Sequence, residues 1–220
     1  MMIAVIPIMT SNIQSVLISV YIYDVNPFIS FGNALLIMNK SEAVSLLKEH
    51  VKTESLLHHC LSTAAVMKGL AKELNEDENL WELIGVLHDI DYEEINEDMT
   101  IHGIRGAEIL KSAGIPAEVT EPIRKHNHMV FGRNYTEKVD ICLQTADSVS
   151  GLIIACAKVK GGCVSDVAVK SVAKKYKSPS FAAGCDRERI ASTDVFIERE
   201  KMYEIAIREI TEIKDELGLT

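Results

Sequence analysis

The sequence predicts an all-α protein, and three observations support this class. Apolar residues recur at helical spacing through nearly the whole chain after Met38. The same part has no sustained alternation of apolar and polar residues, which a half-buried strand would show. The 220 residues, 47% hydrophobic and 25% charged, suffice for one sizeable core and are too few for two full-size domains. We therefore expect one helical bundle preceded by an irregular N-terminal extension.

Residues 1–37 differ from the rest of the chain. No charged residue occurs from Ile3 to Tyr23, and this stretch is about long enough to span a bilayer. Because Pro7 and several polar residues interrupt it and no Lys or Arg precedes it, a membrane anchor is not the expectation. The alternatives are an extension that packs on the body of the protein and a translation start at Met38.

In the first half of the chain, apolar spacing and capping residues define four helices. Ser41 is suited to cap a short first helix. The second covers about residues 53–74 and ends at a polar break. The third has apolar residues at helical spacing over 80–87 and leads into an acidic loop. The fourth covers about residues 102–113 and is stopped by Gly114.

Prolines and glycines mark the helices of the second half. Pro116 suits the first turn of a helix that reaches His126, although Pro122 should bend or break that helix. The remaining expected helices cover residues 137–158, 167–177 and 187–217. The first of these is strongly apolar, and the last is amphipathic and offers a surface on which two copies of the chain could pair. We assign residues 38–165 to one helical domain and 166–220 to a helical extension packed on it.

Charge and cysteine content exclude several classes of protein. A net charge of −9 disfavours a nucleic acid polymer as partner, because the summed field repels polyanions. A small phosphorylated substrate is compatible with this charge if a local metal cluster attracts it. The five cysteines are odd in number and include no C-x-x-C pair. We expect reduced thiols in a cytoplasmic protein, not a disulfide framework or a zinc ribbon.

Six side chains that could bind a divalent metal recur along the middle of the chain. They are His59, His88, Asp89, His102, His126 and Asp147. Imidazole and carboxylate together suit Mn, Zn, Fe or Ni. Any single histidine among them could instead be satisfied by a backbone carbonyl at the edge of the core. Asp147 is harder to explain in this way, since a carboxylate in the most apolar helix needs a metal or an arginine beside it.

Four segments resemble the motif blocks of the HD-domain metal-dependent phosphohydrolases, and they occur in the order of that family. They are His59–Ala64, Val86–Asp91, His102–Leu110 and Gln144–Ser148. The resemblance covers about residues 53–160, and the chain looks like the HDIG-type subgroup from prokaryotes. It implies an HD-domain helical bundle, one or two divalent metal ions, and hydrolysis of a phosphate ester by a metal-activated water.

The resemblance also implies roles for individual residues. One ion would be held by His59, His88, Asp89 and Asp147, and a second by Asp89, His102 and His126. Asp89 would be a catalytic residue. Asp91 is a second candidate catalytic residue, which follows from its place beside the metal ligands and not from the resemblance. Asp91 replaces the usual glycine of the motif, and it could orient water, act as an acid or cap the following turn. Asn127 stands where members that cleave cyclic dinucleotides have a second histidine, which argues against that activity.

Two basic residues are the candidates for binding the substrate phosphate. Arg105 follows His102 by three residues, and Lys125 is next to His126. The alternative is that both are solvated, as most helical Lys and Arg residues are. We expect a cytoplasmic enzyme that hydrolyses a small phosphate ester, such as a nucleotide or a related metabolite. The alternatives are a non-catalytic nucleotide-binding sensor and a membrane-tethered phosphodiesterase-type regulator, which would depend on residues 3–23.

Overall fold

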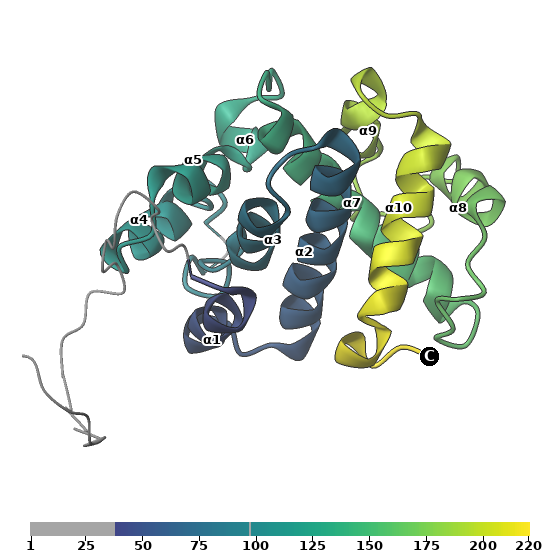
Figure 1. Ribbon diagram of the computed structural model, residues 1–220, viewed down its shortest axis with the longest axis horizontal. Helices are drawn as coiled ribbons and strands as arrows, with labels where there is room; N and C mark the ends of the chain where they lie inside the picture. The colour runs from purple at the N-terminus through teal and green to yellow at the C-terminus, as the bar shows by residue number, and fades with distance from the viewer. Residues whose placement is uncertain (1–37, 97) are drawn as a thin grey trace, which may run out of the picture.

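The computed structural model describes residues 38–96 and 98–220, which fold into helices joined by loops (Figure 1). No strand occurs within these two ranges, so the all-α prediction is confirmed. The predictions about the apolar stretch before Met38 fall outside the described residues.

Ten α-helices and two 3-10 segments make up the described part of the chain. The helices are α1 (Lys40–His50), α2 (Glu54–Leu74), α3 (Glu78–Leu87), α4 (Ile104–Ser112), α5 (Ala117–Lys125), α6 (His128–Phe131), α7 (Lys138–Lys158), α8 (Val169–Tyr176), α9 (Arg187–Ala191) and α10 (Arg199–Glu212). The 3-10 segments are η1 (Ser192–Val195) and η2 (Lys214–Leu217).

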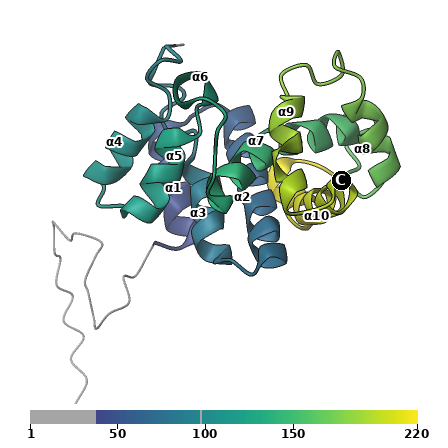
Figure 2. The ribbon, with the colours of Figure 1, turned by 90° about the horizontal axis from the view of Figure 1, so that it is seen from above.

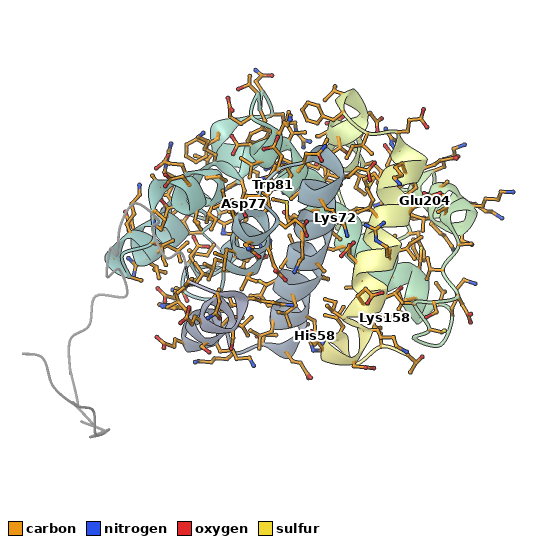
Figure 3. All side chains as sticks on the ribbon, viewed as in Figure 1. His58, Lys72, Asp77, Trp81, Lys158 and Glu204 are labelled. Atoms are coloured by element: carbon orange, nitrogen blue, oxygen red, sulfur yellow. The ribbon has the colours of Figure 1, made fainter. Side chains whose placement is uncertain are left out.

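The two longest helices, α2 and α7, form the centre of the bundle. Helix α2 packs against α3, α7 and α10, and the labelled side chains His58 and Lys72 mark its two ends in Figure 3. In both Figure 1 and Figure 2, α4, α5 and α6 lie on one side of α2, and α8, α9 and α10 lie on the other. The C-terminal helices share the core of the bundle, since Val172, Tyr203 and Ile205 are fully buried within it.

Helix α7 is the one helix in the described ranges that is long and apolar enough to cross a membrane, and 72% of its most apolar window is buried inside the protein. Its apolar composition follows from its central position, where α2, α3, α5, α9 and α10 all contact it.

One prediction about a helix end is wrong, and one of the two outcomes expected at Pro122, a break, does not occur. Asn39, not Ser41, caps α1: its side chain accepts from the backbone amide of Glu42, and the Glu42 side chain accepts from the amide of Asn39. Pro122 does not break α5. Proline has a helical φ and removes one backbone donor, and the short helix tolerates this loss.

The single helix predicted over residues 187–217 is also wrong. The structure has α9, η1, α10 and η2 there instead. The chain turns at Thr193, whose carbonyl accepts the amides of both Phe196 and Ile197. This turn separates α9, which packs on α7, from α10, which packs on α2 as well.

Candidate metal centre

Helices α2 and α3 bring the first two candidate ligands together. Gly85 in α3 allows a close approach, because a Cβ atom added to it would lie 2.5 Å from the Cα of Ala64 in α2. His59 in α2 faces His88, which directly follows α3, and their Nε2 atoms are 3.2 Å apart. Imidazole nitrogens lie about 2.0–2.1 Å from a zinc ion, so two nitrogens at this separation can share one ion.

A second pair of histidines lies beside the first, with a carboxylate between the pairs. His102 precedes α4 and His126 follows α5, and their Nε2 atoms are 3.0 Å apart. Oδ1 of Asp89 is 3.3 Å from Nε2 of each of them. Oδ2 of Asp89 is 3.5 Å from Nε2 of His59. The carboxylate of Asp89 is therefore shared by the two pairs.

Asp147 reaches the first pair from α7. Its Oδ1 is 3.2 Å from Nε2 of His59, and its Oδ2 accepts a hydrogen bond from Arg189. The cation that this buried carboxylate requires is thus an arginine on one oxygen, while the other oxygen faces the histidines. Among the described residues, two groups could each hold a metal ion: His59, His88 and Asp89, and Asp89, His102 and His126.

Three of the four histidines are oriented through their Nδ1 atoms. The acceptors are the carbonyl of Gly85 for His88 (2.9 Å), the carbonyl of Ile123 for His126 (2.6 Å) and Oδ1 of Asp91 for His102 (2.9 Å). Since these oxygens accept, each Nδ1 carries a proton, and Nε2 is left toward the cluster. Metal-binding histidines have this arrangement, so the donor set fits a divalent ion.

Burial and mutual contacts set the protonation of the cluster. Burial lowers the pKa of His88 to about 4, which keeps it neutral near pH 7, as a ligand must be. Burial opposes ionisation of Asp89 and Asp147, but nearby histidines hold the pKa of Asp89, and Arg189 and His59 that of Asp147, well below the usual range. Burial lowers the pKa of His102, yet hydrogen bonds with two carboxylates raise it to about 10. The second proton of the His102 ring would sit on Nε2, so it competes with a metal ion for that nitrogen.

Asp91 lies behind the cluster and does not line the cleft. Its side chain is fully buried, and Oδ1 accepts from His102 while Oδ2 accepts from the amides of Gly103 (2.7 Å) and Gly106 (2.9 Å). Gly103 has a φ of +80°, a conformation that favours glycine. Of the three roles considered for Asp91, this geometry matches the cap of the following turn, combined with orientation of His102.

The structure does not bring the two predicted phosphate-binding residues to the cleft. Arg105 is half exposed and pairs with Glu94 and Glu108, and Lys125 pairs with Asp140. Neither residue lines the cleft that contains the candidate ligands. Arg189, which was not among the residues predicted from the sequence, lines the cleft instead. The one signal for it was that Asp147 needs a cation, but spacing alone could not say which arginine provides it.

The cluster lies at the base of a cleft of about 740 Å³. The candidate ligands His59, Asp89 and Asp147 contribute to its walls, together with apolar side chains. Tyr92 lines it with 46% of its surface exposed and lies edge-on to the ring of His102 at 5.4 Å. A cleft of this size can hold a small organic molecule.

A helical bundle whose core presents four histidines and two aspartates, from two helices and from the turns next to three others, defines a class, the helical proteins with a divalent metal centre. Residues 56–152 match the family model of the HD domain. The matched range includes all six candidate ligands.

A curated relative is similar to part of the chain. The relative is Ribonuclease Y of Fusobacterium nucleatum subsp. nucleatum, 30% identical over 97 residues. The match covers 44% of this chain and 18% of Ribonuclease Y. No solved structure gives a significant match.

Proposed function

We propose that this protein is a metal-dependent phosphohydrolase that cleaves a small phosphate ester. The observation that carries the proposal is the convergence of four Nε2 atoms on the shared carboxylate of Asp89, at the base of a cleft within an HD domain. HD domains are metal-dependent hydrolases as a class.

The residues supply a buried, preorganised set of donors. His59, His88, Asp89 and Asp147 would hold one divalent ion, and His102 and His126 would hold a second with Asp89. Such ions, when bound, supply Lewis-acid activation of water and of phosphate oxygens. The acceptors behind His88, His102 and His126 keep the Nε2 atoms of these three rings turned toward the cluster, so little reorganisation is needed when substrate arrives.

A nucleotide or a related aromatic phosphate is the substrate class that the cleft supports best. The exposed ring of Tyr92 and the side chains of Leu56, Met99 and Met129 line the cleft beside the metal centre. Such surfaces can stack against a base. We further propose a cytoplasmic location and a substrate smaller than a nucleic acid polymer, in line with the net charge of −9.

Similarity to Ribonuclease Y makes RNA the substrate to test against this proposal. The match covers less than a fifth of that protein, so a substrate of the whole relative does not carry over to this chain without a test. A short oligoribonucleotide therefore belongs in the substrate panel.

The decisive experiment is a hydrolysis assay on metal-stripped protein resupplied with Mn, Zn, Fe, Co or Ni in turn. Phosphomonoesters, phosphodiesters, nucleotides and the oligoribonucleotide are offered, and released phosphate or cleaved strand is measured. Metal-dependent turnover of a small ester is the expected result. The protein could instead show no turnover with any metal, although it binds metal and is thermally stabilised by a nucleotide. That result would contradict the proposal of an enzyme and favour the alternative of a non-catalytic nucleotide-binding sensor.

A further inference from the structure

Arg189 occupies a special place in the cleft. Among the described residues that line it, Arg189 is the one lysine or arginine. It follows the matched HD domain range by 37 positions in sequence, since that range ends at residue 152, yet its guanidinium lies against Asp147 of α7. The cationic side of the cleft thus comes from the C-terminal extension.

The backbone of Arg189 is fixed from both directions. Its amide donates to the side chain of Asp186, which caps α9, and its carbonyl accepts from Oγ1 of Thr145 (2.9 Å). Thr145 lies two residues before Asp147 on α7. The next residue, Ile190, is fully buried. Arg189 is therefore held in register with Asp147.

The loop before α9 is also held in place. The guanidinium of Arg187 donates to a set of backbone carbonyls that includes those of Ala182, Cys185 and Phe181. Arg187 points into this loop and braces it. The loop brings Gly184 to the wall of the cleft, so Arg187 positions the segment and Arg189 faces the cleft.

The guanidinium of Arg189 has hydrogen-bonding capacity beyond its ion pair. Nη2 donates to Oδ2 of Asp147, and the buried Nε has no acceptor among the described residues. The side chain is 13% exposed, toward a cleft whose base carries the metal-binding groups. A planar, permanently charged fork in this position matches the oxygens of a phosphoryl group.

We propose that Arg189 binds the phosphoryl oxygens of the substrate, which makes it a substrate-binding residue contributed by the C-terminal extension. The inference rests on the proposed function, because it assigns the anion-binding side of the same site. The competing explanation is that Arg189 only neutralises Asp147. In that case its removal would change stability and metal binding but not the affinity for an anion at equal metal content.

The test measures binding of inorganic phosphate to the metal-loaded full chain by titration calorimetry. Arg189→Gln removes the charge, and Arg189→Lys keeps the charge opposite Asp147 but lacks the fork. Arg208→Gln, on the exposed face of α10 and paired with Glu209, is the matched control. Metal content by elemental analysis and melting temperature are recorded for each protein.

We expect Arg189→Gln to weaken phosphate binding about 10- to 100-fold, as loss of hydrogen bonds to a charged group predicts. Arg189→Lys should weaken it less, and Arg208→Gln should not change it. If Arg189→Gln fails to fold or to hold metal, Arg189→Lys decides the question. Unchanged phosphate affinity in the Arg189 variants that hold metal as the unmodified protein does would overturn the proposal.

Failure of this proposal and failure of the proposed function give different results. If the Arg189 variants bind phosphate more weakly but the unmodified protein hydrolyses no ester, the anion-binding role of Arg189 is supported and the proposed hydrolase activity is rejected. If the unmodified protein hydrolyses an ester but substitution of Arg189 leaves the phosphate affinity unchanged, the proposed hydrolase activity is supported and the phosphate-binding role of Arg189 is rejected.

Discussion

At the scale of single residues, Asp89 has a different position from every other candidate ligand, because it belongs to both metal-binding groups. Asp89→Ala should therefore remove both ions and abolish hydrolysis. His88→Ala should remove the ion that His88 shares with His59, and it should also abolish hydrolysis. His102→Ala should remove one group and leave the other. Elemental analysis of the purified variants, together with the hydrolysis assay, measures this. Full metal content in Asp89→Ala would contradict the shared-ligand arrangement.

Asp91 provides a second test at this scale. Asp91→Asn keeps the size of the side chain but loses the charge that holds Nδ1 of His102 and the amides of Gly103 and Gly106. Loss of such a supporting contact costs about 10- to 100-fold in metal affinity. Asp98 is an exposed aspartate in the same loop, and its side chain accepts from the backbone amide of Thr100. Asp98→Asn should leave the metal affinity unchanged. Equal affinities for the two variants in a competition titration with a chelator would show that Asp91 does not orient the ligand.

The sequence predicted the candidate ligands because their chemistry leaves few alternatives. Histidine and aspartate on core-facing helix positions need partners, and their order along the chain resembles a known family. The direction of a surface side chain carries no such signal. Arg105 and Lys125 neighbour His102 and His126 in sequence, but both pair with nearby carboxylates. Arg189 lies 42 positions from its partner Asp147, which no spacing rule anticipates.

At the scale of helices, the crossing of α2 and α3 places His59 and His88. Gly85→Ala should push the helices apart, because its new Cβ would meet the backbone of Ala64 at 2.5 Å. Overpacking of this kind costs about 1–3 kcal/mol, and the higher helix propensity of alanine returns at most ~1 kcal/mol. We expect a lower melting temperature and weaker metal binding, measured by thermal unfolding and metal titration.

Gly69→Ala is the control for this prediction. Gly69 lies on α2, the helix that carries His59, and a Cβ there would meet Ile205 of α10 at 2.7 Å and the flexible side chain of Glu209 at 2.5 Å. It should also lower stability, but with metal affinity preserved, because α10 carries no candidate ligand. If both variants weaken metal binding equally, the effect is a general loss of packing and not a displacement of His88.

Helices with strong apolar spacing were predictable, and those decided by tertiary contacts were not. The observed bounds of α2 and α7 agree with the predicted bounds within one residue at each end. The four-residue α6 was not predicted, because it is too short to show a period; Asn127 caps it through the amide of Met129. The break after α9 depends on Thr193, which is buried and within reach of Thr145 in α7. This contact exists only in the folded chain.

At the scale of the whole molecule, the candidate metal centre depends on residues outside the range that matches the HD domain. The match ends at residue 152, but α10 packs along α2 and α9 packs on α7. These contacts place Arg189 beside Asp147 and bury the outer faces of two ligand-bearing helices. The assignment of residues 38–165 to one helical domain and of 166–220 to an extension packed on it stays a prediction. Residues of both ranges contribute to one core.

Global stability should depend on pH through Asp140, which is buried in the first turn of α7. Burial raises the pKa of this carboxyl, although Lys125 opposes the shift. Because the folded pKa exceeds the unfolded value of about 3.9, the free energy of unfolding falls as pH rises through the folded pKa and is then constant. Asp140→Asn should therefore raise the melting temperature near neutral pH, and this gain should vanish as the pH approaches about 4. Asp166→Asn, at an exposed position, should show no such gain when both variants are melted across the same pH series. A gain from Asp140→Asn that persists at low pH would mean that the amide improves packing and that ionisation of Asp140 is not the cause.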